Sequence, residues 1–328
     1  MINIHYSLLA ALAPLSAAAV TLMLTRIMLA SSVFTKIQDI PNARSLHDRP
    51  IPRIGGLAIM FGLLSGWYLL ANPIAIVLYA GVIILLLISL LDDLRSIQAK
   101  LRLVVHLAVA VGFVRLGLPP IPTYLQALLV FGLVWMINIF NFMDGSNGLA
   151  GGMAVFGFAF YALSAGLNGD INFALMNLSI VASSLSFLFF NFGRARVFMG
   201  DAGSIPLGFL AAAMGLIGNY SGLWPLWFPV VIFSSFILDA TATLLKRCLR
   251  GERFWEAHSE HYYQRVIKMG WSHQKTAIFE YGIMVISGFV ALLSVRLTLL
   301  HASLLLIAFF SLMIFIMYLV DAKWRQYA

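Results

Sequence analysis

Two adjacent carboxylates, Asp92 and Asp93, follow a long apolar run and are the first residues in this sequence that could do chemistry. At the end of a hydrophobic segment they lose hydration and repel each other, so one tends to stay protonated unless a cation is near. The pair is suited to proton abstraction, metal binding or both, and the alternative is a solvated helix end. Lys100 adds a positive charge that could contact a phosphate or could only set the topology.

Amides and a carboxylate form a second cluster. Asn138 and Asn141 are one helical turn apart, and Asp144 continues the same progression. Gly145 and Gly148 permit a turn and a close backbone approach, and the helix that follows begins with free N–H groups. This set suits a uridine, phosphate or metal site, and the alternative is a pair of helix caps. Two asparagines within an apolar helix favour a functional role, because unpaired amides are costly in a bilayer.

A third candidate is Asp201, which lies between two glycines with Arg194 and Arg196 upstream and a predicted helix start downstream. A carboxylate in such a turn can bind a divalent cation whose other side faces phosphate oxygens. The alternative is a basic turn that is capped by Asp201 or Ser204.

The long loop 246–275 is rich in Lys and Arg, and it contains His258 and His261 at a spacing that places both imidazoles on one helical face. Zinc is excluded, because a catalytic zinc site needs three protein ligands. Several cations with two histidines and Arg265 fit a polyanion such as a diphosphate, and the alternative is a basic loop lying on anionic lipid. Asp239, inside an apolar run, is functional or paired by default at that depth.

Composition decides which class of protein holds these residues. Of 328 residues, 61% are hydrophobic and 10% are charged, and the mean hydropathy is +0.93. A soluble surface needs roughly 25% charged residues, so a soluble enzyme or a nucleic-acid-binding protein is excluded. The net charge of +8 is explained by the basic loops of a membrane protein. The single cysteine, Cys248, rules out an intrachain disulfide and a multi-cysteine metal site.

Apolar runs divide the whole chain, 1–328, and predict one integral-membrane domain: an all-α, polytopic protein with about 11 transmembrane helices, or 10. The runs are continuous rather than alternating, which favours helices over the strands of a membrane barrel. The first run is interpreted as a retained span, because no basic region precedes it and no signal-peptidase site follows. The runs lie near 8–30, 54–71, 74–91, 103–118, 123–142, 149–167, 171–190, 204–219, 223–245, 276–296 and 301–320.

Basic residues set the expected orientation. Of the 21 Lys and Arg, 18 fall in alternate loops and the C-terminal tail, which predicts that these segments are cytoplasmic, with the N-terminus outside and the C-terminus inside. The polar clusters described above all fall on that same side. We therefore expect a single cytoplasm-facing site at the membrane boundary.

Taken together, these residues resemble the polyprenyl-phosphate N-acetylhexosamine-1-phosphate transferase superfamily, glycosyltransferase family 4. The resemblance covers most of the chain, and five motifs occur in order on one predicted face. They are His47-Asp-Arg-Pro-Ile-Pro-Arg53-Ile-Gly-Gly56, Asp92-Asp93, Asn138-x-x-Asn141-x-x-Asp144-Gly145, Met199-Gly-Asp201-Ala-Gly-Ser204 and His258-x-x-His261-Tyr-Tyr-Gln-Arg265.

The resemblance implies a reaction at the inner membrane of a bacterium. The phosphate of undecaprenyl phosphate attacks the β-phosphorus of a UDP-amino sugar and UMP is released, with Mg²⁺ as cofactor and Mn²⁺ as an alternative. It assigns catalysis and metal binding to Asp92, Asp93 and Asp201. A cation is required because two anionic substrates must approach each other. The resemblance also favours a homodimer, and no nucleic acid is expected as a partner.

Substrate binding is implied for nine residues, some of them in the cytoplasmic loop 246–275. The amides and Asp144 would line the nucleotide, and the histidines with Arg265 would hold the diphosphate or sugar. The nine are Arg53, Lys100, Asn138, Asn141, Asp144, Asn147, His258, His261 and Arg265.

Two departures from the superfamily pattern indicate which branch of the superfamily this chain resembles. Asn147 stands where the superfamily often has a second aspartate, so this position can bond a ligand but carries no charge. His258 and His261 are spaced, whereas the peptidoglycan branch usually has adjacent histidines. This favours the branch that initiates O-antigen or enterobacterial antigen, with UDP-N-acetylglucosamine or a 6-deoxy or C4-epimeric relative as donor. The alternative is a phospho-N-acetylmuramoyl-pentapeptide transferase.

A transporter or a flippase for lipid-linked sugars is the alternative from another class. It would need polar residues along the whole membrane depth, whereas here they gather at one face and only Asp239 lies deeper. A CDP-alcohol phosphotransferase is excluded, because its Asp-Gly-x-x-Ala-Arg pattern is missing from the sequence.

Overall fold

The computed structural model describes residues 10–31, 37–41, 49–70, 75–95, 97–253, 256 and 258–327. His47, which opens the first motif, lies outside these ranges. Strands β1 (Gln38–Asp39) and β2 (Ile51–Pro52) pair antiparallel. Thirteen helices occur in the described residues: α2 (Ala13–Ala30), α3 (Gly55–Leu70), α4 (Ala75–Arg95), α5 (Ala99–Leu116), α6 (Thr123–Phe142), α7 (Leu149–Leu167), α8 (Ile171–Asn191), α9 (Asp201–Tyr220), α10 (Trp227–Ile232), α11 (Ser234–Leu249), α12 (Tyr262–Lys268), α13 (His273–Arg296) and α14 (Leu299–Tyr327).

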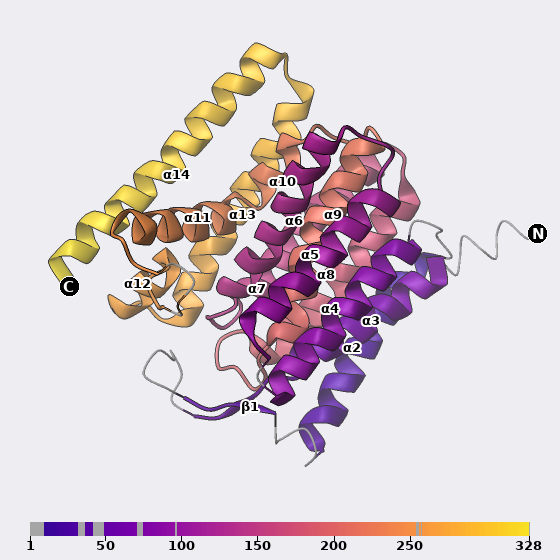
Figure 1. The fold of residues 1–328 in the computed structure, drawn as a ribbon, viewed down its shortest axis with the longest axis horizontal. Helices are drawn as coiled ribbons and strands as arrows, with labels where there is room; N and C mark the ends of the chain where they lie inside the picture. The colour runs from indigo at the N-terminus through magenta and orange to yellow at the C-terminus, as the bar shows by residue number, and fades with distance from the viewer. Residues whose placement is uncertain are drawn as a thin grey trace, which may run out of the picture.

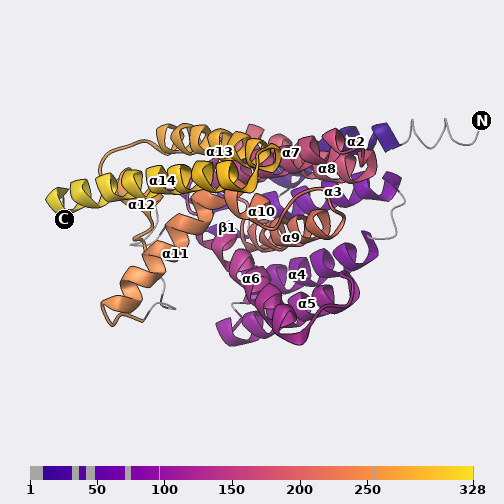
Figure 2. The ribbon, with the colours of Figure 1, turned by 90° about the horizontal axis from the view of Figure 1, so that it is seen from above.

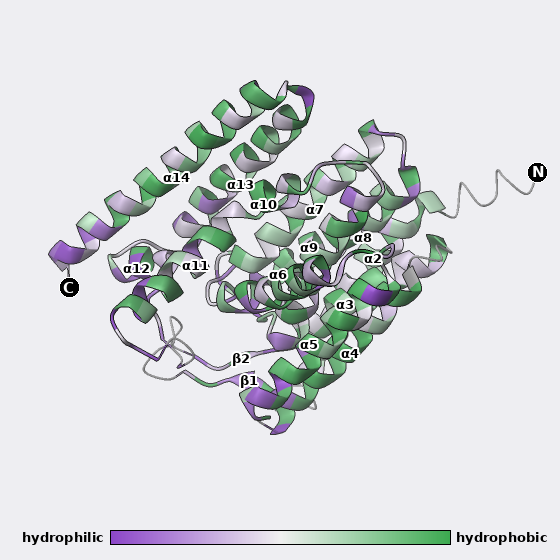
Figure 3. Ribbon diagram, turned by 45° about the horizontal axis from the view of Figure 1, so that its top comes forward, coloured by the Kyte–Doolittle hydropathy of each residue, from purple (hydrophilic) through white to green (hydrophobic). Residues whose placement is uncertain are grey.

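Among the described helices, eight are long and apolar enough to cross a membrane: α2, α4, α6, α7, α8, α9, α13 and α14. Helix α3 is a shorter apolar helix of 16 residues. Hydrophobic residues cover most of these helices, and hydrophilic residues gather around β1, β2 and α12 (Figure 3). The prediction of an all-α, polytopic membrane protein is therefore confirmed.

The apolar run near 223–245 is interrupted rather than continuous. The chain leaves the helix at Phe233, between α10 and α11, where φ is −92° and ψ is 14°. The Phe233 ring is buried against Phe158 and Tyr161, at ring-centroid distances of 6.0 and 5.7 Å. This aromatic contact fixes the bend, and α11 then extends away from the bundle, as Figure 2 shows.

Helix α9 occupies the middle of the bundle. Seen from above, α9 and α3 lie between a layer that contains α4, α5 and α6 and a layer that contains α2, α7 and α8 (Figure 2). Most of α9 is buried, whereas most of α14 is exposed. Because Asp201 is the first residue of α9, its carboxylate is held at the end of the most enclosed helix.

Two glycines allow α3 and α9 to touch through their backbones. A Cβ atom on Gly56 would lie 2.1 Å from the backbone nitrogen of Gly203, and a Cβ on Gly203 would lie 2.6 Å from the Cα of Gly56. Any side chain at either position would force the helices apart. The contact therefore fixes the start of α9 against the start of α3.

Backbone hydrogen bonds extend this contact to the segment before α3. The amide of Phe198 donates to the carbonyl of Pro52 (2.8 Å), and the amides of Gly55 and Gly56 donate to the carbonyls of Phe198 (2.9 Å) and Met199 (2.8 Å). The chain between Pro52 and Gly55 is thus held directly beside the turn that leads into α9.

The last helix is tied to α12 by one carboxylate. Asp321 of α14 accepts hydrogen bonds from Arg265 Nη1 (2.9 Å), from Tyr262 Oη (3.0 Å) and from Lys246 Nζ. Helix α14 otherwise diverges from the bundle toward the C-terminus (Figure 1).

Candidate active site

Three helix ends meet at a cluster of opposite charges. Asp92 lies near the end of α4, Asp201 begins α9, and Arg102 is in the first turn of α5. The Nη1 atom of Arg102 donates to Asp92 Oδ2 (2.6 Å) and to Asp201 Oδ2 (2.9 Å). The two carboxylates predicted to act together are thus brought to a single cationic nitrogen.

Local structure holds each carboxylate in place. Asp92 Oδ1 accepts a hydrogen bond from the backbone amide of Ile97 (2.6 Å), which fixes the turn after α4. Asp201 follows Gly200, whose φ of 68° is in the left-handed region that glycine tolerates. At the first residue of a helix a carboxylate is also stabilised by the helix dipole.

Asn141 links the second predicted cluster to Asp201. Its Nδ2 atom donates to Asp201 Oδ1 (2.8 Å) and lies 3.0 Å from Ser204 Oγ, and Ser204 Oγ in turn donates to the carbonyl of Gly200 (3.2 Å). Both Asp201 oxygens are therefore engaged, one by an amide and one by the Arg102 guanidinium.

Asp93 is enclosed beside this cluster. Its side chain is 3% exposed, and its Oδ1 atom lies 3.9 Å from Nη1 of Arg53. Arg53 also bonds Asp39 of β1 at 2.7 Å. The Oδ2 atom of Asp93 is buried and receives no hydrogen bond within the described part of the chain. A buried carboxylate oxygen with no partner is costly, so Asp93 has an acceptor atom available for a proton or a ligand.

Asp144 lies in the turn between α6 and α7. Burial raises the pKa of the Asp144 carboxyl well above its ordinary value, and the negative charge of Asp201 raises it further, while Arg53 and the backbone amide of Gly200 lower it by less. Both effects favour the protonated form of this carboxyl relative to a free aspartic acid.

Three predicted residues have no direct bond to this cluster. Asn138 Nδ2 donates to the carbonyl of Val134 in its own helix (2.7 Å), and Asn147 Nδ2 donates to the carbonyl of Gly193 (2.8 Å). Lys100 is exposed on α5. Their assignment to substrate binding stays a prediction.

The late loop forms a second polar group around Asp239 of α11. Asp239 Oδ1 accepts from the backbone amide of Tyr262 (2.8 Å) and lies 3.2 Å from His261 Nδ1, and Asp239 Oδ2 accepts from the amide of Tyr263 (3.0 Å). The expectation that Asp239 is functional or paired is met by these partners. Tyr263 Oη donates to the carbonyl of Phe142 (3.1 Å), so the loop is fastened to the end of α6.

His258 and His261 are neighbours, with ring centroids 4.9 Å apart. Burial, followed by the adjacent His261 and Arg247, lowers the pKa of His258 to about 4, so this imidazole is neutral near pH 7. Arg265 is buried, and it is held by Asp321 and by the carbonyl of Glu260 (2.6 Å). In this structure Arg265 fixes α12 to α14, and its predicted contact with substrate stays a prediction.

The carboxylates have the chemistry that a magnesium site requires. Across the described residues, no three His, Cys, Asp or Glu side chains already surround one point that could hold a metal. The donor set nevertheless suits Mg²⁺, because Asp92 and Asp201 converge on one cationic nitrogen and Asp93 has an unused buried oxygen. Mg²⁺ commonly takes one or two carboxylates and fills its remaining positions with water and phosphate oxygens.

Arg102 is central to the cluster, but it is not among the residues that the sequence predicts for the site. Lys100 is among them, and both residues are basic and lie at the start of the same helix. Two residues correspond to about 200° of rotation around a helix, so the two side chains point in opposite directions. The adjacent acids Asp92 and Asp93 indicate that a cation must be near. The direction in which each side chain leaves α5 decides whether that cation is Lys100 or Arg102.

The sequence is similar to a known family of glycosyl transferases. The model of glycosyl transferase family 4 matches residues 75–219, which include Asp92, Asn141 and Asp201. The chain is 32% identical over 263 residues to the probable undecaprenyl-phosphate N-acetylglucosaminyl 1-phosphate transferase of Bacillus subtilis, covering 74% of this chain and 73% of that protein.

Two further relatives are more distant. Identity is 28% over 289 residues to the decaprenyl-phosphate N-acetylglucosaminephosphotransferase of Mycobacterium leprae, covering 74% of this chain and 72% of that protein. It is 28% over 286 residues to the undecaprenyl-phosphate alpha-N-acetylglucosaminyl 1-phosphate transferase of Salmonella typhi, covering 77% and 75%. The chain belongs to glycosyl transferase family 4, the polyprenyl-phosphate N-acetylhexosamine-1-phosphate transferase superfamily, as its motifs predicted.

Proposed function

We propose that the protein transfers a phospho-N-acetylamino sugar from a UDP-sugar to undecaprenyl phosphate and releases UMP. The donor is UDP-N-acetylglucosamine or a 6-deoxy or C4-epimeric relative, and the reaction initiates O-antigen or a related surface polysaccharide. The printed names of the relatives support an N-acetylglucosamine donor and a polyprenyl phosphate acceptor. The spacing of His258 and His261 in the loop 246–275 supports assignment to the branch that initiates O-antigen or enterobacterial antigen.

The observation that carries this proposal is the convergence of Asp92, Asp201 and Asn141 on one point, with the Arg102 guanidinium between the carboxylates. Phosphoryl transfer between two anions depends mainly on positioning and on neutralising charge. Arg102 and Arg53 supply fixed positive charge where the two substrates would meet.

Asp92, Asp93 and Asp201 are the residues that would hold Mg²⁺, which neutralises phosphate charge when bound. Asp93, with its free buried oxygen, accepts the proton or binds near the lipid phosphate. Asp144 and Asn141, which lie beside Asp201, are the residues that we propose for the nucleotide side of the site. His258, His261 and Arg265 are the residues that we propose to hold the diphosphate or the sugar.

Release of UMP tests the reaction. The purified chain is incubated with undecaprenyl phosphate, Mg²⁺ and, in turn, UDP-N-acetylglucosamine, its C4 epimer, a 6-deoxy relative and the muramoyl pentapeptide donor. We expect UMP from an N-acetylhexosamine donor only when both lipid and Mg²⁺ are present. UMP from no donor, in a preparation that remains monodisperse, would reject the proposal. Release from the muramoyl donor alone would move the protein to the peptidoglycan branch.

We further propose that the active site faces the cytoplasm in the bacterial inner membrane. The single cysteine, Cys248, is exposed near the end of α11, so it reports the side on which the late loop lies. A membrane-impermeant maleimide should label it only after cells are permeabilised. In a Cys248→Ser background, Thr298→Cys, between α13 and α14, should be labelled in intact cells. The opposite pattern would reverse the orientation.

A further inference from the structure

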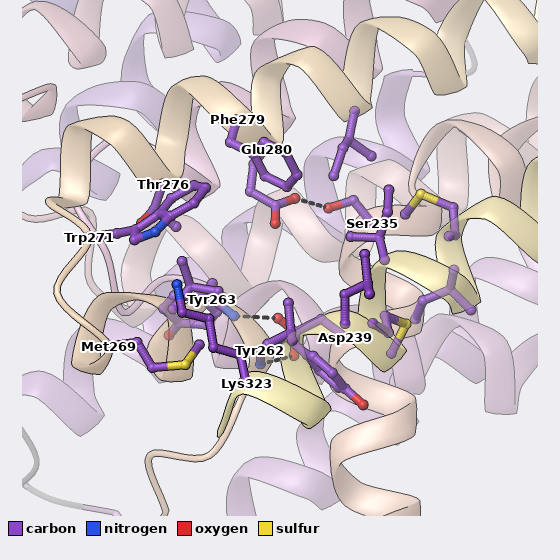
Figure 4. A pocket seen from close by; sticks show the side chains of 18 residues that line it. Ser235, Asp239, Tyr262, Tyr263, Met269, Trp271, Thr276, Phe279, Glu280 and Lys323 are labelled. Atoms are coloured by element: carbon purple, nitrogen blue, oxygen red, sulfur yellow. Dashed lines mark hydrogen bonds between the residues drawn. The ribbon is translucent and has the colours of Figure 1, made fainter. Parts of the chain in front are cut away.

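A cavity of about 410 Å³ lies between α11, α12, α13 and α14, apart from the Asp92–Asp201 cluster. This volume is within the range of ligand sites, about 300–1,000 Å³. Figure 4 shows side chains from these helices pointing into it. Its walls are mainly apolar, formed by residues such as Leu238, Phe279, Ile283, Met313 and Ile316.

Three charged side chains line this cavity, and one of them, Asp239 of α11, is already bonded to the backbone amides of Tyr262 and Tyr263. Glu280 enters from α13 and accepts a hydrogen bond from Ser235, and Lys323 enters from α14. In Figure 4 the Lys323 side chain extends toward Tyr263 and Met269, away from the Glu280 carboxyl. Within the described chain, neither Glu280 nor Lys323 forms an ion pair, which leaves both charges available to a ligand in the space between them.

The cavity lies near one end of two candidate membrane spans, α13 and α14. Glu280 is about 10 Å along α13 from His273, and Lys323 is about 6 Å along α14 from Tyr327, and both helices are candidate membrane spans. The Asp321 bonds and the Tyr263 hydroxyl bond place this end of the helices beside α6 and the candidate active site. In the orientation proposed above, this end of the cavity lies near the cytoplasmic boundary of the membrane.

We propose that this cavity binds a zwitterionic membrane phospholipid that carries a primary ammonium group. The ammonium pairs with Glu280 and bonds alongside Ser235, the phosphate pairs with Lys323, and one acyl chain lies against the apolar wall. A carboxylate at this depth is costly unless it is paired, and the ammonium supplies that pairing with N–H donors.

Charge complementarity favours this occupant over other lipids. A phospholipid with only negative charge, or a prenyl phosphate, would pair with Lys323 and leave the Glu280 carboxylate with no cationic partner. A choline head group has the correct charge, but its quaternary nitrogen has no N–H to donate to Glu280. An ethanolamine head group pairs with both charged residues, because its ammonium can bond Glu280 while its phosphate pairs with Lys323.

Native mass spectrometry of the full chain tests the proposal without substrates. The protein is titrated with phosphatidylethanolamine, phosphatidylcholine and phosphatidylglycerol at matched concentrations. We expect wild type to bind phosphatidylethanolamine about tenfold more tightly than phosphatidylcholine, as for one hydrogen bond to a charged group. Glu280→Gln should remove that preference, and Lys323→Gln should weaken the binding of both lipids.

Matched variants separate binding from folding. Arg325→Gln removes an exposed charge two residues from Lys323 on the same helix, outside the cavity lining, and should leave lipid affinity unchanged. Ile316→Trp should fill the cavity and reduce lipid binding while Glu280 and Lys323 remain. The proposal is overturned if wild type shows no preference for the primary amine. It is also overturned if phosphatidylglycerol binds more tightly, or if a folded Ile316→Trp protein keeps the wild-type preference.

Discussion

Asp92 and Asp201, which lie on different helices and far apart in the chain, are bonded to the same Nη1 atom of Arg102. One guanidinium thus bridges two carboxylates that would otherwise repel each other, and it offsets one of their two negative charges. The arrangement sets the spacing of the two acids before any substrate arrives. It also places a positive charge at the point where two phosphates would have to meet.

Replacement of Arg102 should therefore impair transfer more than folding. We expect Arg102→Gln to reduce UMP release on the order of 10²-fold, the effect of removing one group that stabilises developing charge. Arg115→Gln, near the other end of α5, is the matched control and should retain activity. An Arg102→Gln enzyme with wild-type kcat/KM would show that the guanidinium is dispensable.

Asp201→Asn should abolish turnover with little loss of stability. The amide is nearly the same size and its oxygen can still accept from Arg102 or Asn141, but it lacks the charge that a divalent cation requires. We expect a loss on the order of 10³-fold, with a thermal midpoint close to wild type. Activity is measured as UMP release and stability by thermal scanning fluorimetry. Wild-type rates would refute the assignment of Asp201 to the metal.

Gly56→Ala should destabilise the protein, because a methyl group would collide with the backbone of Gly203. Overpacking of this kind costs about 1–3 kcal/mol, and displacement of α9 should also lower activity. Gly112→Ala is the control, since no atom lies within 4 Å of its added Cβ. Its thermal midpoint should be unchanged or slightly higher. Equal midpoints for the two variants would contradict the close contact of α3 and α9.

His258 should make the stability of the folded chain depend on pH. Its pKa of about 4 in the folded chain lies below the ordinary 6.5, so the unfolded chain binds the proton more readily. The stability that results is present above pH 6.5 and is lost as the pH falls toward 4. His258→Gln should therefore show a smaller fall in thermal midpoint between pH 7.5 and 5. His301→Gln, exposed on α14, should fall as wild type does.

Much of the fold could be predicted because the apolar runs are long and clearly separated. Eight of them correspond to helices that can span a membrane. The interruption at Phe233 could not be predicted, since it depends on packing against Phe158 and Tyr161, which are distant in the chain. A hydropathy pattern gives no information on such contacts.

The site was predictable where residue type alone indicates chemistry. Asp92, Asn141 and Asp201 are acids or amides in apolar surroundings, and the structure brings them together. The cation was not predictable, because Arg102 and Lys100 differ only in helix rotation. Arg265 shows the same limit: its partner Asp321 lies on the last helix, and such pairing is invisible until the helices are assembled.

The dependence of the late loop on Asp321 has a consequence for biogenesis. Arg265, Tyr262 and Lys246 leave the ribosome well before the carboxylate that binds them. Until α14 has been translated and inserted, three of the groups around α12 lack their counterpart. A nascent chain that stalls before Asp321 could already form the cluster of Asp92, Arg102 and Asp201. The loop that carries His258 and His261 would still lack its bonds to α14.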